Sequence, residues 1–420
     1  MGTALRTNRT RMASATARWV LPAGGLALVA VVVFGLCINA AARLPCYDVC
    51  GSDIGRLYQD RGIDRHHPPY FSRDFEYPPL IGAVMFAAGV PFDHGLRGPF
   101  LVNVALLVAL AAITTWVLWR RNGDRAWRWA LAPPLLVQGL TNWDLLSVAP
   151  ATIGLVRWES GAALSAGVLL GVGAAAKLYP ALYVPILAAT CIGRRERRRA
   201  AELIVGSVIG FGAFALPVYT IAPRALRYLL TFHADRGPDR GALWYFVFRG
   251  PSMQPWLRAD VITHIVTIVP TILIGAVVVA LSVAAGRGRV SPFAACALAT
   301  IAFLLTSKIY SPQYDLWIVP FFVLLPVRTK LVVHFYAASF LVFVLTASDD
   351  HFLHRPASAY VLAIAVVYRA VVLALVAMGL LRDDRGEPGR AVAPDEVDLR
   401  DASDEVAGEI SDARVYSERG

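Results

Sequence analysis

Apolar runs long enough to cross a bilayer recur along the chain and alternate with short polar or charged segments. No water is present in hydrocarbon to satisfy the backbone, so each run predicts a membrane-spanning α-helix. The first run, 19–42, is long and ends without a clean small-residue cleavage site, which predicts a retained span rather than a signal peptide. Further spans are predicted at about 99–119, 126–141, 144–158, 161–177, 179–193, 201–220, 261–284, 290–306, 313–327, 330–347 and 357–381.

The run 77–92, YPPLIGAVMFAAGVPF, has two interpretations. If it crosses the membrane, the basic segment WRRNGDRAWR lies outside and every later connection is reversed. If it is an interfacial or re-entrant segment, about twelve crossings remain, the Arg-rich connections lie inside and both termini are cytoplasmic. The positive-inside rule favours the second interpretation. The outer face then gathers the polar segments 43–76, 141–144, 177–180, 221–260 and 307–312.

Composition agrees with a membrane protein, because 57% of the 420 residues are apolar and only 17% are charged. The formal net charge is +10, although the segment 382–420 holds six arginines and twelve acidic residues. The remaining chain therefore carries +16, which indicates basic cytoplasmic connections rather than nucleic-acid binding. We predict a cytoplasmic N-terminal segment at 1–18, a transmembrane domain at 19–381 and a disordered acidic cytoplasmic tail at 382–420.

The first outer connection holds the stretch CGSDIGRLYQDRG, residues 50–62. Its apolar residues have helical spacing, which predicts a short amphipathic helix on the membrane surface with Asp53 at its N-terminus. Asp53 is then either a helix cap or a catalytic carboxylate. Asp48 is a second candidate, and Glu76 in FEYPPL is a charge at a lipid boundary without an evident structural need. Cys46 and Cys50 flank this region and allow a disulfide.

Two lysines end predicted spans at the outer face, Lys177 before LYP and Lys308 before IYSP. Either lysine can simply extend to the lipid headgroups. Lysines that do so are commoner on the cytoplasmic side, however, so this pair points to an anionic group such as a phosphate. Tyr179 and Tyr310 follow the two lysines and are candidates for the same anion site.

Other outer segments carry aromatic and charged residues that suit a sugar as well as a membrane interface. Asp144 in TNWD starts a predicted helix and is either its cap or a ligand. The candidate substrate-binding residues are Tyr77, Asp144, His233, Arg236 and Trp244. The chain shows no clustered carboxylates and none of the common nucleotide or hydrolase motifs, so we expect neither a metal nor a cofactor.

Taken in order, SDIGRLYQDRG, FEYPPL, TNWDLL, KLYPAL and SPQYDLW resemble glycosyltransferase family 87 over roughly 19–380. This is the polyprenol-phosphate-mannose-dependent α-mannosyltransferase family. The resemblance implies an all-α, GT-C-like bundle of about twelve transmembrane helices, with interfacial helices in the first external loop and an outward-facing cavity. It also implies that Asp53 is the general base, with Asp48 as a fallback. Less securely, it places the lipid phosphate near Lys177, Tyr179, Lys308 and Tyr310.

The activity implied is transfer of a mannosyl or related residue from a polyprenyl-phosphate sugar to a cell-envelope glycolipid or polysaccharide. Transfer would take place at the outer face of the plasma membrane by an inverting single displacement, without a metal. The alternative is a proton-coupled secondary transporter. Transporter sites lie near the bilayer midplane between structural repeats, whereas the polar candidates here gather at one face and no repeat is visible.

Overall fold

The computed structural model describes residues 4–46, 52–72, 74–92, 95–249, 254–347 and 356–386. Helices make up nearly all the regular structure of these residues, which also include an isolated bridge between Arg249 and Pro255. The helices are α1 (Ala4–Arg43), η1 (Leu44–Cys46), α2 (Asp53–Asp60), η2 (Ile63–Arg65), α3 (Pro79–Gly89), α4 (Arg97–Asn122), η3 (Gly123–Ala126), α5 (Trp127–Ala130), α6 (Pro133–Gln138), α7 (Leu145–Glu159), α8 (Ala163–Ala176), η4 (Tyr179–Leu182), α9 (Tyr183–Gly193), α10 (Arg197–Ile221), α11 (Pro223–Asp235), α12 (Leu243–Val247), α13 (Ala259–Gly286), α14 (Pro292–Thr306), η5 (Pro312–Trp317), α15 (Val319–Leu324), α16 (Thr329–Ala347) and α18 (Pro356–Gly386).

Six helical segments within the described residues are long and apolar enough to cross a membrane. They are Ala23–Arg43, Arg97–Ala130, Arg197–Ile221, Ala259–Gly286, Thr329–Ala347 and Ser358–Arg382. Shorter apolar helices, among them α8, α9 and α14, pack between them. The prediction of an all-α, polytopic membrane protein is therefore confirmed, and the short amphipathic helix predicted to begin near Asp53 is α2.

The tightest helix pair is α8 with α10, and small residues make it possible. A methyl group placed on Gly167 of α8 would lie 2.1 Å from the carbonyl oxygen of Leu203, and one on Gly210 of α10 would lie 2.1 Å from that of Val168. Larger side chains at these positions would force the backbones apart. Close approach at small residues is the usual way in which helices associate in lipid, where apolar burial gives little net drive.

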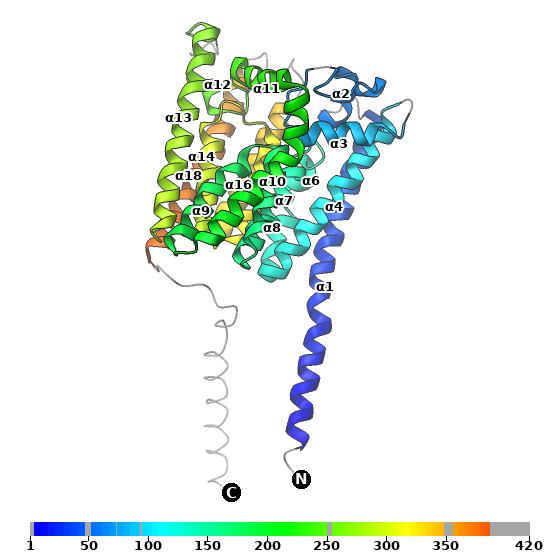
Figure 1. Ribbon diagram of the computed structural model, residues 1–420, viewed down its shortest axis with the longest axis vertical. Helices are drawn as coiled ribbons and strands as arrows, with labels where there is room; N and C mark the ends of the chain where they lie inside the picture. The colour runs from blue at the N-terminus through cyan, green and yellow to red at the C-terminus, as the bar shows by residue number, and fades with distance from the viewer. Residues whose placement is uncertain are drawn as a thin grey trace.

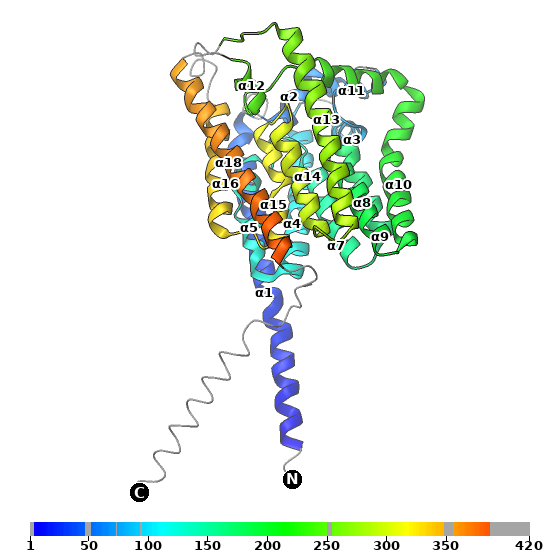
Figure 2. The ribbon, with the colours of Figure 1, turned by 90° about the vertical axis from the view of Figure 1, so that its left-hand side faces the viewer.

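The two ends of the bundle differ in chemistry. Figure 1 shows α2, α3, α11 and α12 gathered at one end, which we call the cavity end, whereas the first half of α1 extends from the opposite end. Basic connections meet at that opposite end, where Arg121 pairs with Glu159 at 2.5 Å and Arg128 donates to the carbonyl oxygen of Val327 at 2.8 Å. Figure 2 shows the same separation of the two ends after a quarter turn.

Helix α3 corresponds to the run with two interpretations. It has 11 residues, which gives a length of about 16 Å at the usual rise per residue. A bilayer core is about 30 Å thick, so α3 is too short to cross it. Two prolines, Pro78 and Pro79, stand at its start and fix the chain direction there. Its length agrees with the predicted interfacial or re-entrant segment.

Candidate functional site

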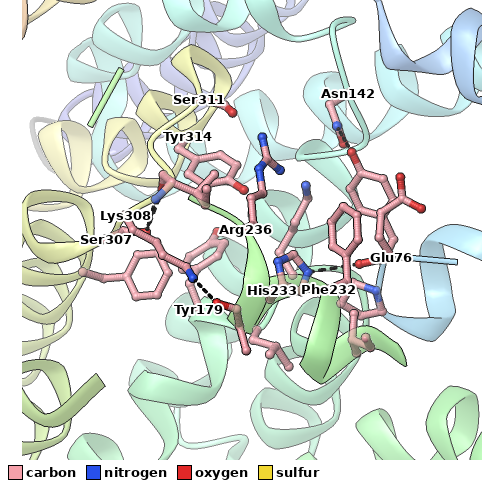
Figure 3. A pocket seen from close by; sticks show the side chains of 18 of the residues that line it. Glu76, Asn142, Tyr179, Phe232, His233, Arg236, Ser307, Lys308, Ser311 and Tyr314 are labelled. Carbon is pink, nitrogen blue, oxygen red and sulfur yellow. Dashed lines mark hydrogen bonds between the residues drawn. The ribbon is translucent and has the colours of Figure 1, made fainter. Parts of the chain in front are cut away.

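A cavity of about 710 Å³ opens at the cavity end and has two unlike walls. The polar wall comes from α2, the segment before α3, and the junctions that precede α7 and follow α8. The opposite wall comes from α11, α13 and α14 and is mainly apolar, with Leu229, Leu230, Phe232, Val266, Pro270, Ile274 and Phe303. Figure 3 shows Glu76 and Asn142 on one side of this cavity and Lys308 and Tyr314 on the other. The volume falls in the range typical of ligand sites.

Helix α2 is fixed to the bundle at its first turn. The Ser52 hydroxyl donates to the carbonyl oxygen of Leu140 at 3.0 Å, and the Asp53 amide donates to that of Thr141 at 2.9 Å. The apolar residues of α2, including Ile54, are buried against the bundle. The helical spacing predicted this helix but placed it on the membrane surface; its apolar face is instead buried against the bundle, and this packing turns the start of α2 toward the cavity.

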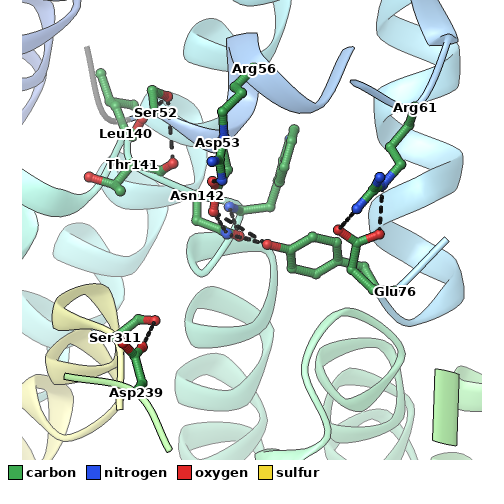
Figure 4. A network of polar contacts seen from close by, with 12 residues as sticks. Ser52, Asp53, Arg56, Arg61, Glu76, Leu140, Thr141, Asn142, Asp239 and Ser311 are labelled. Atoms are coloured by element: carbon green, nitrogen blue, oxygen red, sulfur yellow. Dashed lines mark hydrogen bonds and ion pairs between the residues drawn. The ribbon is translucent and has the colours of Figure 1, made fainter. Parts of the chain in front are cut away.

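The Asp53 carboxylate is held by three donors (Figure 4). Its Oδ2 accepts from Asn142 Nδ2 at 2.7 Å and from the Tyr77 hydroxyl at 3.3 Å, while Oδ1 accepts from Arg56 at 2.9 Å. Asn142 Nδ2 also donates to the Tyr77 hydroxyl at 2.8 Å, which closes the network. Asp53 is the first residue of α2, with Ser52 in the cap position, and its carboxylate bonds these side chains instead of capping the helix. The side chain is 22% exposed, so a ligand in the cavity can reach it.

The Glu76 carboxylate has a different environment. Arg61 grips it with two hydrogen bonds, of 2.9 Å and 2.7 Å, and the Glu76 side chain is only 10% exposed. His233 Nε2 lies 3.1 Å from the Glu76 carbonyl oxygen and must donate there, because a carbonyl only accepts. The ion pair joins the end of α2 to the segment before α3. The hydrogen bond from His233 holds α11 against the same segment.

Lys177 lies in a cage of aromatic rings and one acid. Its Nζ is 4.7 Å from the ring centre of Tyr77, 5.5 Å from that of Tyr314 and 4.0 Å from Asp144 Oδ1. Asp144 is buried, accepts from Trp317 Nε1 at 2.8 Å, and does not line the cavity itself. The cage balances the charge of the ammonium group with a carboxylate and two ring faces.

Lys308 and Arg236 form the second cationic group of the cavity. Lys308 Nζ donates to the Ala234 carbonyl oxygen at 2.8 Å and to the Thr267 hydroxyl at 2.6 Å. Burial lowers the pKa of Lys308 to about 8, Asp235 opposes this shift, and the nearby Arg236 adds to it. Within the described ranges, neither Lys308 nor Arg236 has a carboxylate within ion-pair distance. The cavity lining that the described residues form on this side therefore holds two cations and no carboxylate, while Asp235 lies near Lys308 outside the lining.

Besides Asp144, two further predicted ligands lie outside the cavity lining. The Tyr310 hydroxyl donates to the buried Asp315 at 2.5 Å, and Arg369 covers the ring, so this side chain is turned into the bundle and does not line the cavity. Trp244 donates from Nε1 to the Thr306 carbonyl oxygen at 2.6 Å and also lies outside the lining. The polar group of each side chain is already hydrogen-bonded within the bundle, which does not favour a ligand role.

The other predicted site residues either line the cavity or lie outside the described residues. Tyr77, Tyr179, His233 and Arg236 line the cavity as expected, together with Asp53, Glu76, Lys177 and Lys308. Asp48 and Cys50 lie outside the described residues, as does the side chain of Cys46, so the fallback base and the disulfide stay predictions. The described ranges bring no group of three or more metal-ligating side chains together, and metal independence also stays a prediction.

Sequence reasoning gave no site role to three residues of the cavity. Asn142 binds Asp53, and the stacked rings of Tyr314 and Trp317, 4.1 Å apart, form the floor beside Lys177. Trp317 also stacks on Tyr179 at 4.3 Å. In the sequence, Asn142 lies in TNWDLL, and Tyr314 and Trp317 lie in SPQYDLW. Both segments carry the family resemblance and could have pointed to these residues.

Comparison with known proteins gives a family match and a distant structural likeness. The model of glycosyltransferase family 87 matches residues 75–312. Among solved structures, the crystal structure of ArnT from Cupriavidus metallidurans bound to undecaprenyl phosphate is similar, with a TM-score of 0.43 and 15% sequence identity. That likeness covers 88% of this chain and 77% of that chain. The curated proteins contain no match.

Proposed function

This chain belongs to glycosyltransferase family 87 and is a membrane glycosyltransferase, and we propose that its donor is mannose linked to a polyprenyl phosphate. The acceptor is a glycolipid or polysaccharide of the cell envelope, and transfer takes place at the outer face of the plasma membrane. One observation carries this proposal. A single cavity combines a reachable carboxylate, an unpaired cationic group and an apolar wall.

The two walls of the cavity suit the two ends of such a donor. The apolar residues along α13, from Val266 to Ile274, extend over about 12 Å of helix and give a polyprenyl tail a surface that matches lipid. Lys308 and Arg236 supply cations for the phosphate, and neither has a carboxylate within ion-pair distance in the described part of the chain. Guanidinium and ammonium groups are the usual phosphate ligands of proteins.

Asp53 is the proposed general base. The acceptor hydroxyl oxygen attacks the anomeric carbon of mannose, and the bond from that carbon to the phosphate oxygen breaks. The phosphate leaves with the bonding electron pair, and the hydroxyl proton passes to Asp53. A single displacement inverts the anomeric centre, so a β-linked donor gives an α-linked product. The hydrogen bonds from Asn142 and Tyr77 fix the direction of the carboxylate before the acceptor arrives.

Charge stabilisation at the phosphate and alignment of the two substrates provide the rest of the rate acceleration. The phosphate is already a good leaving group, so no strong acid is needed behind it. Lys308 and Arg236 stabilise the charge that develops on the phosphate oxygen as the bond breaks. Because donor and acceptor are both held at the same membrane face, part of the entropy cost of bringing them together is already met.

The test uses Asp53→Asn in lipid nanodiscs with radiolabelled polyprenyl-phosphate-mannose and an envelope lipid extract. Asparagine keeps the shape and loses the base, so transfer should fall at least about 100-fold, while donor binding is retained. Asp260→Asn is the matched control, since Asp260 is an exposed carboxylate of α13 outside the cavity. Equal activity of Asp53→Asn and wild type would remove Asp53 from the reaction. Absence of transfer by wild type would overturn the donor assignment and favour the transporter alternative.

A further inference from the structure

A second cleft, of about 420 Å³, adjoins the cavity at the end of α2. Asp60 and Arg61 line both spaces, so they share a wall. The rest of the second cleft comes from the segment before α3 and from the first half of α11. We call it the outer cleft, and its lining residues are Asp60, Arg61, Ser72, Asp74, Arg224 and Tyr228.

The outer cleft offers more free carboxylate than free guanidinium, because Arg61 is already paired with Glu76 on the cavity side. Two carboxylates and two guanidinium groups line it. Asp60 and Asp74 make no hydrogen bond or ion pair with the residues that the structure describes, so their oxygens are free to accept. Arg224 uses one N–H on the Phe71 carbonyl oxygen at 2.9 Å and keeps its other donors. Free carboxylate oxygens beside a guanidinium group with spare donors suit an uncharged ligand rich in hydroxyl groups, each of which both donates and accepts, and the two carboxylates disfavour an anionic one.

Tyr228 adds an apolar face and a phenolic hydroxyl to the same cleft. Its ring lies 5.8 Å from that of Phe232, which lines the larger cavity. Aromatic side chains of this kind offer a flat apolar surface with a polar group at the edge. A sugar presents the complementary pattern, with C–H groups on the ring face and hydroxyls around the rim.

Helix α2 sets the distance between the two spaces. Asp53 is its first residue and Asp60 its last. Seven residues of helix correspond to a rise of about 10 Å. A ligand in the outer cleft therefore reaches the Asp53 carboxylate only if it extends by roughly that length along α2, past the Arg61–Glu76 ion pair. A single sugar ring in the outer cleft would stop short of Asp53.

We propose that the outer cleft is the acceptor subsite and that it binds an uncharged oligosaccharide. The terminal hydroxyl lies at Asp53, and the sugar units behind it occupy the outer cleft beside Asp74 and Tyr228. Donor and acceptor thus come from different sides, the donor along the apolar wall and the acceptor over the end of α2. This inference rests on the proposed function, because it takes Asp53 as the base.

The experiment measures binding and transfer with the full chain in nanodiscs. The probes are three trisaccharides (α-linked mannotriose, maltotriose and cellotriose) and the single sugar methyl α-mannoside. Binding is followed by saturation-transfer NMR, which needs no turnover. We expect at least one trisaccharide to bind about tenfold more tightly than the single sugar. In the double variant Asp74→Asn with Tyr228→Phe this advantage should be lost, because a charged acceptor and a hydroxyl are removed from the cleft. Asp260→Asn should keep it.

The outcomes separate this inference from the proposed function. The subsite is overturned if no trisaccharide binds better than the single sugar, or if the double variant keeps the advantage. Retained binding of undecaprenyl phosphate by the double variant shows that the protein is folded. If mannose transfer from the lipid donor fails in wild type but the trisaccharide advantage depends on Asp74 and Tyr228, the donor assignment falls and the oligosaccharide subsite stands.

Discussion

Lys177 and Lys308 have the same setting in the sequence, at the end of an apolar run and shortly before a tyrosine, but their surroundings in the fold are unlike. They are almost equally buried, at 7% and 9% exposed. Lys177 lies 4.0 Å from the Asp144 carboxylate and faces two tyrosine rings. Lys308 contacts one carbonyl oxygen and one hydroxyl, and its nearest charged neighbours include Arg236.

Because the two lysines are buried to nearly the same extent, their roles depend on the groups that each one contacts. Lys177 and Asp144 together carry no net charge, so the pair holds the polar wall in place without a strong demand for an anion. Lys308 is desolvated and also feels the like charge of Arg236, which Asp235 opposes, so an anion bound beside the two cations would offset both effects. Under the proposed function, the comparison predicts a structural role for the first lysine and phosphate binding for the second.

Lys177→Met should give the largest effect, and it should fall on stability. Methionine keeps the volume but leaves the buried Asp144 without its cation. Removal of one partner from a buried pair typically costs about 3 kcal/mol. We expect the thermal midpoint in detergent to fall by several degrees, as measured by intrinsic tryptophan fluorescence.

The double variant Lys177→Met with Asp144→Asn is the control for this prediction. It removes both charges, so most of the lost stability should return, and donor affinity should stay near that of wild type. The assignment of different roles to the two lysines is wrong if the double variant recovers its thermal midpoint but binds the donor as weakly as Lys308→Met. Both lysines would then serve the phosphate.

Lys308→Met should lower donor affinity with little change in stability. The loss of a charged hydrogen-bond donor to the phosphate costs about 2 kcal/mol, or roughly 30-fold in KM for polyprenyl-phosphate-mannose. The folded state also no longer has to bury an ammonium group, so the thermal midpoint should not fall. The opposite result, an unchanged KM with a lower midpoint, would mean that Lys308 only caps the end of α11 through the Ala234 carbonyl oxygen.

Much of the fold could be predicted from the sequence because lipid restricts the choices. Apolar runs become helices, and their ends are marked by proline or by charge, as at Pro292 with the Ser291 cap of α14. The amphipathic spacing after Asp53 predicted α2 for the same reason, since one face had to be buried. The positive-inside rule favoured an interfacial or re-entrant segment at 77–92, and the short helix α3 agrees with it.

The site was predictable only as a set of residue types on one side of the membrane. Glu76 looked like an unpaired charge because its partner, Arg61, stands 15 positions earlier in a different element. Tyr310 and Trp244 looked like ligands, but the direction of a side chain after a helix break depends on what packs against it. Here Asp315 and the Thr306 carbonyl oxygen draw the two side chains away from the cavity. Such pairings are fixed by the tertiary structure alone.

The smallest expected effect is on pH dependence, and it sharpens the comparison of the two lysines. The pKa of Lys308 is lowered to about 8, so its charge is present below that pH and is lost as pH rises through it. Between pH 7 and pH 9 the charged fraction falls about tenfold, and kcat/KM for the donor, which reports on the free enzyme, should fall by up to that factor. Arg236 keeps its charge throughout and limits the loss. Lys308→Met should show a flat profile in this range, whereas Lys177→Met with Asp144→Asn should keep the decline. A decline that survives Lys308→Met would assign the titration to another group and leave Arg236 as the main phosphate ligand.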